Sequence, residues 1–149
     1  MDVAMNGELS DDELWAAFGA AALPAPAWTH RAHLRVAWLF LQRHPLDEAH
    51  VLLRVGIIRL NAFHGLVETP ARGYHETLTR VWLALIAALP AAAAAAAPSS
   101  AAFVDAHQAA LGRDAALRHY SRERLMSVRA RAMFVEPDLL PLPAAPPSI

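Results

Sequence analysis

Apolar residues recur at helical spacing along almost the whole chain, and no stretch alternates with the two-residue period of a strand. The expected helices also begin at residues that favour helix starts. Ser10 and Glu13 form a capping box, Thr29 is a good N-cap, and Pro45 separates two helical stretches. We therefore predict an all-α fold, an up-and-down helical bundle of about five helices with an irregular C-terminal extension.

The chain length of 149 residues favours a single helical domain over 1–149. The expected helices run from Ser10 to the loop at 23–26, and then over about 29–44, 45–65, 74–89 and 101–111. Residues 113–135 are predicted to form short helices capped by Ser121 and Ser127. Two segments are expected to lie outside the bundle, an alanine-rich linker at 91–100 and a proline-rich tail at 136–149, which we expect to extend over the surface.

Composition narrows the possible chemistry. There is no cysteine, so thiolate metal sites and disulfides are excluded, and any metal must be held by nitrogen and oxygen ligands. All 13 basic residues are arginine, which excludes lysine Schiff bases and P-loops. A net charge of −1 disfavours nucleic-acid binding. The uncharged stretch 81–97 is short for a membrane span and contains Pro90, and the acidic N-terminus lacks a secretory signal, so we expect a cytoplasmic protein without a membrane partner.

Four of the eight histidines lie near the ends of the expected helices. In 29–44, His30 falls on the apolar stripe and His33 borders it, while His64 and His75 continue the apolar rows of the next two helices. Short loops make consecutive helices antiparallel, so these helix ends are predicted to meet at one end of the bundle, where His119 joins them.

Imidazole is the commonest protein metal ligand. The leading hypothesis is therefore a divalent metal ion, Zn or Fe, held by His30, His33, His64 and His75 and serving a small-molecule hydrolysis or lyase reaction. Glu68 and Glu76 are possible oxygen donors. An alternative role for Glu76 is an ion pair with Arg80, four residues later.

Two other interpretations stay open. The same end of the bundle can form a metal-free ligand-binding or acid–base pocket, or a structural module whose buried histidines only fix the helix ends. The predicted site residues are catalytic ones, His75, Glu76, Tyr74 and Tyr120, and substrate-binding ones, Arg31, Arg72, Trp28 and Thr79. Arg122 is a further candidate anchor for an anionic small-molecule ligand. The oligomeric state does not follow from the sequence.

Three motifs carry a resemblance to a known group of proteins. They are His-Arg-Ala-His-Leu at 30–34, Gly-Tyr-His-Glu-Thr-Leu-Thr at 73–79 and His-Tyr-Ser at 119–121, with Glu-Pro-Asp-Leu at 136–139 closing the domain. Over about 28–143 the chain resembles small all-helical bacterial proteins of unknown function. The resemblance implies a helical fold and supports this choice of residues, but it implies no particular reaction.

Overall fold

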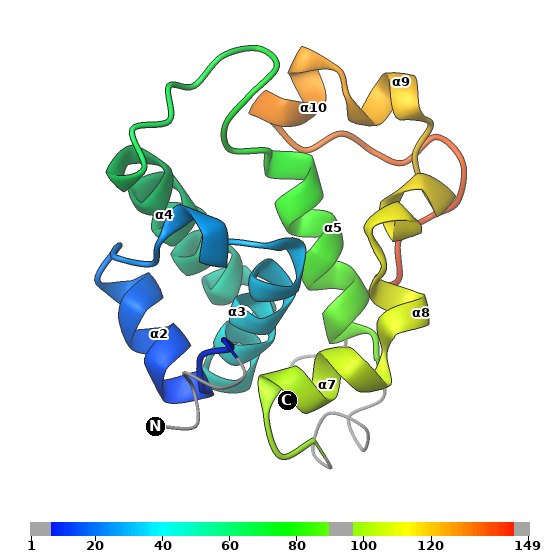
Figure 1. Ribbon diagram of the computed structural model, residues 1–149. Helices are drawn as coiled ribbons and strands as arrows, with labels where there is room; N and C mark the ends of the chain where they lie inside the picture. The colour runs from blue at the N-terminus through cyan, green and yellow to red at the C-terminus, as the bar shows by residue number, and fades with distance from the viewer. Residues whose placement is uncertain (1–6, 90–96, 145–149) are drawn as a thin grey trace.

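The computed structural model describes residues 7–89 and 97–144 and shows an all-α fold, as predicted. The longer helices are α2 (Asp11–Gly19), α3 (His30–Arg43), α4 (Leu46–Phe63) and α5 (Glu76–Ala87). Shorter elements complete the fold: η1 (Ala25–Ala27), α7 (Ser100–Ala106), α8 (Gln108–Leu111), η2 (Arg113–Arg118), α9 (Arg122–Leu125) and α10 (Val128–Ala132). Figure 1 shows α3 near the centre, with α9 and α10 above the start of α5.

The expected caps are present. Ser10 and Glu13 make both bonds of the capping box at α2, and the Thr29 hydroxyl accepts from the Ala32 amide at the start of α3. Ser121 and Ser127 cap α9 and α10 in the same way. These starts were predictable because a cap satisfies backbone donors only two or three residues away.

Two helices differ from the prediction. The expected helix at 101–111 is divided into α7 and α8 at His107, whose backbone leaves the helical region at φ −120° and ψ 27°. Helix α5 starts at Glu76, because His75 is its N-cap. Of the expected linker, 91–96 lie outside the described residues, as do 145–149 of the tail.

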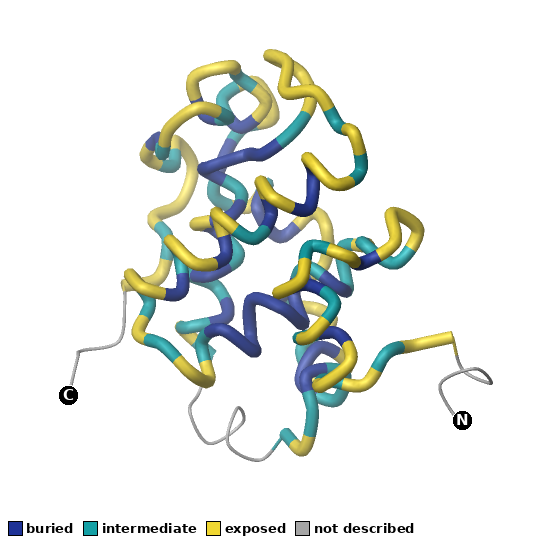
Figure 2. The backbone as a smooth tube through the Cα atoms, turned by 90° about the vertical axis from the view of Figure 1, so that its left-hand side faces the viewer, coloured by how far each residue is buried: buried dark blue, intermediate teal, exposed yellow. Residues whose placement is uncertain are grey.

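Helix α3 forms the centre of the main core. Its residues 34–40 are all buried, since α2, α4, α5 and α7 surround it. Arg35 is therefore buried as well, although its side chain is charged. Figure 2 shows this buried backbone in the middle of the molecule.

A second, smaller core joins the C-terminal extension to α5. Val81 of α5 is fully buried there against Tyr120, Leu125, Ala130 and Val135. The described part of the tail follows the surface, as expected, and is anchored where Asp138 accepts hydrogen bonds from the amide and hydroxyl of Ser121. The extension thus covers the face of α5 that the main core leaves open.

The long connection 64–75 changes how the helix ends meet. Near the start of α4, His50 contacts Glu76 at the start of α5, whereas His64 at the end of α4 bonds the Leu23 carbonyl. The expectation that the end of α4 meets the start of α5 is wrong, because the antiparallel rule holds for short loops only. Within 7–89 and 97–144, no helix is both long and apolar enough to cross a membrane.

Candidate functional site

A groove of about 560 Å³ lies between α3, α5 and the C-terminal extension, and we call it the His30 groove. Its volume is in the range of small-molecule sites. The apolar part of its lining consists of Leu78, Trp82, Ala116, Leu117, Leu125 and Met126. The polar part consists of His30, His33, Thr79, Arg113, Asp114 and Arg122.

Helix α3 contributes both imidazoles of the groove from its first turn. The Nε2 atom of His30 lies 2.9 Å from the carbonyl oxygen of Leu111, and the Nδ1 atom of His33 lies 2.7 Å from that of Thr29. A carbonyl oxygen only accepts, so each of these nitrogens carries the proton. The remaining nitrogens, Nδ1 of His30 and Nε2 of His33, make no hydrogen bond within the described residues.

His33 is held as a neutral ring. It stacks on Trp28 with 3.7 Å between ring centroids. Burial lowers the pKa of His33 to about 4; the bond to Thr29 opposes this shift and the neighbouring His30 adds to it. At neutral pH the ring therefore acts as a hydrogen-bond acceptor and donor and not as a cation.

Helix α5 supplies the wall opposite the imidazoles. The indole of Trp82 meets the His30 ring edge to face at 4.9 Å between centroids. Thr79, one turn earlier, is nearly buried, and its hydroxyl donates to the His75 carbonyl oxygen at 2.9 Å. Thr79 thus lines the groove, and its hydroxyl proton is already donated within the chain.

The C-terminal extension supplies the charged residues. Arg113 and Asp114 come from η2 and Arg122 from the first turn of α9, and all three are exposed. Two arginines against one aspartate leave a formal surplus of one positive charge beside an apolar floor. Of the predicted anion anchors, Arg122 lies at the groove.

His75 makes a hydrogen bond within the chain through each of its ring nitrogens. Its Nδ1 accepts from the Leu78 amide, which caps α5, and its Nε2 donates to the Leu125 carbonyl oxygen at 2.8 Å. Burial lowers the pKa of His75 despite the latter bond, which acts to raise it. Because both ring nitrogens are engaged within the chain, the ring joins α5 to α9 as a structural link.

Tyr74 and Glu76 form a separate polar cluster with His50. The Glu76 carboxylate accepts from the Tyr74 hydroxyl at 2.7 Å and lies 3.1 Å from His50 Nε2, whereas Arg80 lies over the Phe134 ring. The expected Glu76–Arg80 ion pair is therefore replaced. Burial acts to raise the pKa of Glu76, but the hydrogen bonds from Tyr74 and His50 outweigh it and hold the pKa below its ordinary value. Burial also raises the pKa of Tyr74.

Other predicted site residues lie away from the His30 groove. His64 bonds Leu23, and the Nδ1 atom of His119 lies 3.1 Å from two carbonyl oxygens of the tail, those of Leu140 and Pro141. The fully buried Tyr120 donates to the Val135 carbonyl oxygen at 2.7 Å, and burial raises its pKa to about 12. Arg72 is exposed in the turn that its backbone forms with Thr69.

The structure therefore brings His30 and His33 together and leaves His64, His75 and His119 at other positions. Among the described residues, no three His, Asp or Glu side chains are arranged to hold a metal ion. The four-histidine metal centre stays a prediction from the sequence.

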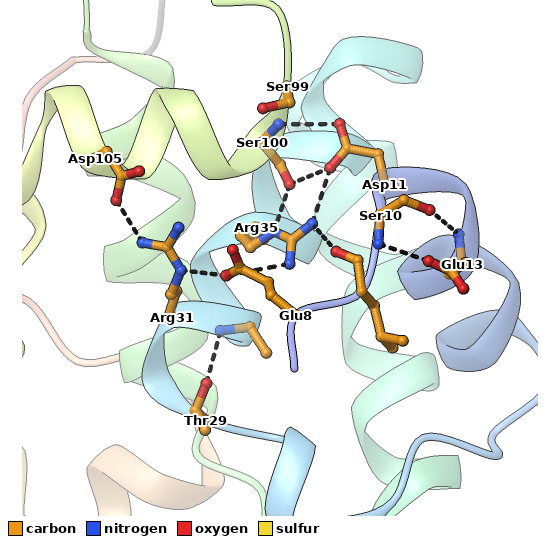
Figure 3. A network of polar contacts seen from close by, with 12 residues as sticks. Glu8, Ser10, Asp11, Glu13, Thr29, Arg31, Arg35, Ser99, Ser100 and Asp105 are labelled. Atoms are coloured by element: carbon orange, nitrogen blue, oxygen red, sulfur yellow. Dashed lines mark hydrogen bonds and ion pairs between the residues drawn. The ribbon is translucent and has the colours of Figure 1, made fainter. Parts of the chain in front are cut away.

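Sequence reasoning missed a buried network around Arg35 (Figure 3). The Arg35 guanidinium donates to the Ser100 hydroxyl at 2.7 Å, to the Leu9 carbonyl oxygen at 2.8 Å and to Asp11 at 3.1 Å, and Ser100 also bonds Asp11. The nearest sequence signal is an arginine within an otherwise apolar run of α3. The network joins the N-terminal segment, α3 and α7.

Arg31 belongs to the same region and not to the His30 groove. Its guanidinium donates to Glu8 at 2.6 Å and to Asp105 at 2.7 Å, contacts that raise its pKa. A cavity of about 180 Å³ lies beside Arg31 and Arg35, but both guanidinium groups are already paired with carboxylates of the chain.

No protein family, curated protein or solved structure matches this chain. Its functional interpretation accordingly rests on the chain's own residues.

Proposed function

We propose that the protein binds a small organic anion with an apolar body in the His30 groove, without a metal. The observation that carries this proposal is the pair of imidazoles, His30 and His33, each held through one ring nitrogen by a backbone carbonyl inside a mainly apolar groove beside two arginines. Such a groove with a few convergent polar groups is typical of small-molecule sites.

The lining of the groove indicates a ligand with two parts, an apolar body and an anionic group. The apolar body lies against Trp82 and Leu117, with Leu78, Leu125 and Met126 completing the surface. The anionic group lies near Arg113 and Arg122, because a guanidinium binds a carboxylate or phosphate through charge-assisted hydrogen bonds.

The low pKa of His33 favours binding of a ligand over abstraction of a proton from it. A ring with a pKa of about 4 is a weak base at neutral pH, so His33 serves as an acceptor for a hydroxyl or amide donor of the ligand. We therefore infer a binding function and assign no reaction to this groove.

A divalent metal is a second candidate, with one observation in its favour. Metal-ligating histidines commonly donate their other ring nitrogen to a backbone carbonyl, as His30 and His33 both do. Two imidazoles alone are a weak ligand set, so a metal site there depends on further ligands from solvent or substrate.

The test compares two ligands of the same shape by isothermal titration calorimetry. 2-Naphthoate carries the charge, and 2-naphthylmethanol is its neutral analogue. We expect the anion to bind about tenfold more tightly than the alcohol, a preference that is lost in the R113M/R122M variant. R129M, which removes an exposed arginine outside the groove, is the matched control and should retain the preference.

Absence of binding by both ligands at millimolar concentration would refute the proposed binding function. A second titration with Zn²⁺ separates the two candidates. Binding of Zn²⁺ that is lost in H30F/H33F, together with naphthoate binding that requires the metal, would support the metal site instead.

A further inference from the structure

Helix α4 carries an apolar face that the rest of the described chain does not cover. Its inner residues Leu53, Ile57 and Leu60 are buried in the main core. On the other side Val51, Leu52, Val55 and Ile58 are exposed, Val51 by 56% and Val55 by 48%. A helix that is apolar on both sides usually has a partner on each.

The exposed residues form one continuous strip. At about 100° per residue, Val51, Val55 and Ile58 lie within about 60° of one another around the helix axis, and Leu52 extends the strip on its other side. Their spacings of four and three are those of a coiled-coil seam. Phe63 at the end of α4 and Val67 in the connection that follows are also exposed, by 60% and 73%.

Charged residues border this strip: Asp47 and Glu48 precede it and Arg59 follows it, while Arg54 at its edge lies over the Tyr74 ring. Glu48 and Arg59 are eleven residues apart, which is three turns plus about 20°, so they lie on the same face about 16 Å apart along the axis. Both are exposed. Glu48 makes one long side-chain contact, 3.4 Å to His44, and Arg59 makes no side-chain hydrogen bond within the described residues.

We propose that a second copy of this chain covers the face, with the two α4 helices antiparallel about a twofold axis between Leu52 and Val55. The midpoint of Glu48 and Arg59 coincides with that of Leu52 and Val55. One axis therefore places each glutamate opposite the partner's arginine while the apolar residues meet at the centre. Such a surface is self-complementary, as an isologous dimer interface requires.

Charge selects this occupant over others. A parallel arrangement of two α4 helices sets Glu48 against Glu48 and Arg59 against Arg59, which is repulsive. A membrane surface favours helices rich in basic residues on their polar side, whereas this strip is bordered by acidic and basic residues alike. The strip spans only about two turns of one helix, so we expect a weak dimer, of about micromolar affinity.

Sedimentation velocity over about 1–200 μM of the full-length chain tests the proposal, a range chosen to bracket that affinity. We expect a concentration-dependent monomer–dimer equilibrium. V55K places a lysine beside the twofold axis and should abolish the dimer over this range. V128K, at an equally exposed valine of α10, is the matched control and should leave the equilibrium unchanged.

Exchanging the charges of Glu48 and Arg59 tests the antiparallel arrangement of the two helices. E48R and R59E each set like charges opposite one another twice and should weaken dimerisation about tenfold. The double variant E48R/R59E restores opposite charges and should recover the affinity. Circular dichroism verifies that each variant is folded, and substitutions at such exposed positions change stability little.

Three results would overturn the proposal: a monomer at every concentration, a dimer that V55K leaves intact, or a double charge exchange that fails to recover the affinity lost in the single variants.

Discussion

Lowering the pH from 7 to 5 is expected to destabilise the fold through His33. An ordinary histidine has a pKa of 6.5, whereas burial lowers the pKa of His33 to about 4 in the folded state. Between about pH 6.5 and pH 4, position 33 of the unfolded chain binds a proton that the folded chain does not bind. The stabilising contribution is complete above pH 6.5 and is lost as the pH falls towards 4.

The magnitude follows from the two pKa values. Proton linkage gives a loss of about 2 kcal/mol in the free energy of unfolding between pH 7 and pH 5, as an upper limit because the ring is only partly buried. His75, whose pKa is also lowered, acts in the same direction. Carboxylates with lowered pKa values, such as Asp11 and Glu76, lose their contribution only below about pH 4.5, outside this window.

Urea unfolding of the wild-type chain and the H33F variant at pH 7, 6 and 5 measures this effect. Phenylalanine retains an aromatic ring against Trp28 but cannot bind a proton. H33F should lose about 2 kcal/mol less stability than the wild type over this range, while the contribution of His75 is common to both. The NMR titration of the His33 ring measures its pKa directly.

Parallel pH profiles for the two proteins, or a His33 pKa above 6, would refute the reasoning. Either result would mean that the ring is solvated enough to be protonated in the folded state, and the groove would then contain a cation at mildly acidic pH.

Three further predictions concern stability and are checked by chemical denaturation. Gly56→Ala directs a new Cβ into the ring of the buried Phe18 and should cost about 1–3 kcal/mol, whereas Gly19→Ala meets no atom and should cost less than 1 kcal/mol; equal effects would contradict this. Arg35→Met removes the three hydrogen bonds of the buried guanidinium and its ion pair with Asp11, so we expect a loss of about 3–5 kcal/mol, and a neutral effect would show that the network is not stabilising. Tyr120→Phe leaves a buried carbonyl without its donor and should cost about 1–3 kcal/mol, with no change in naphthoate binding.

Local physics made the helices predictable. The starts at Ser10, Thr29, Ser121 and Ser127 follow from caps that bond amides within three residues. The break at His107 was not predictable, because the apolar pattern continues through it and the backbone turns there to fit α7 and α8 around α3 and α5.

The candidate site was predictable in part. His30, His33 and Thr79 line the groove, and Trp28 supports His33 by stacking. The arginines at the groove were harder to place, since Arg113 and Arg122 come from short C-terminal elements whose position depends on the second core and not on any periodic pattern.

The amino-acid sequence by itself determined where the helices start and which faces are apolar, because these depend on neighbours three or four positions away. The tertiary structure decided what each imidazole does. The carbonyl groups that bind His30, His64 and His75 lie 81, 41 and 50 residues away along the chain, so no spacing within one helix reveals them. A ring that contacts such a group on one nitrogen, as His30 does, has its other nitrogen open to a ligand, whereas His75 uses both nitrogens in bonds that link α5 to α9.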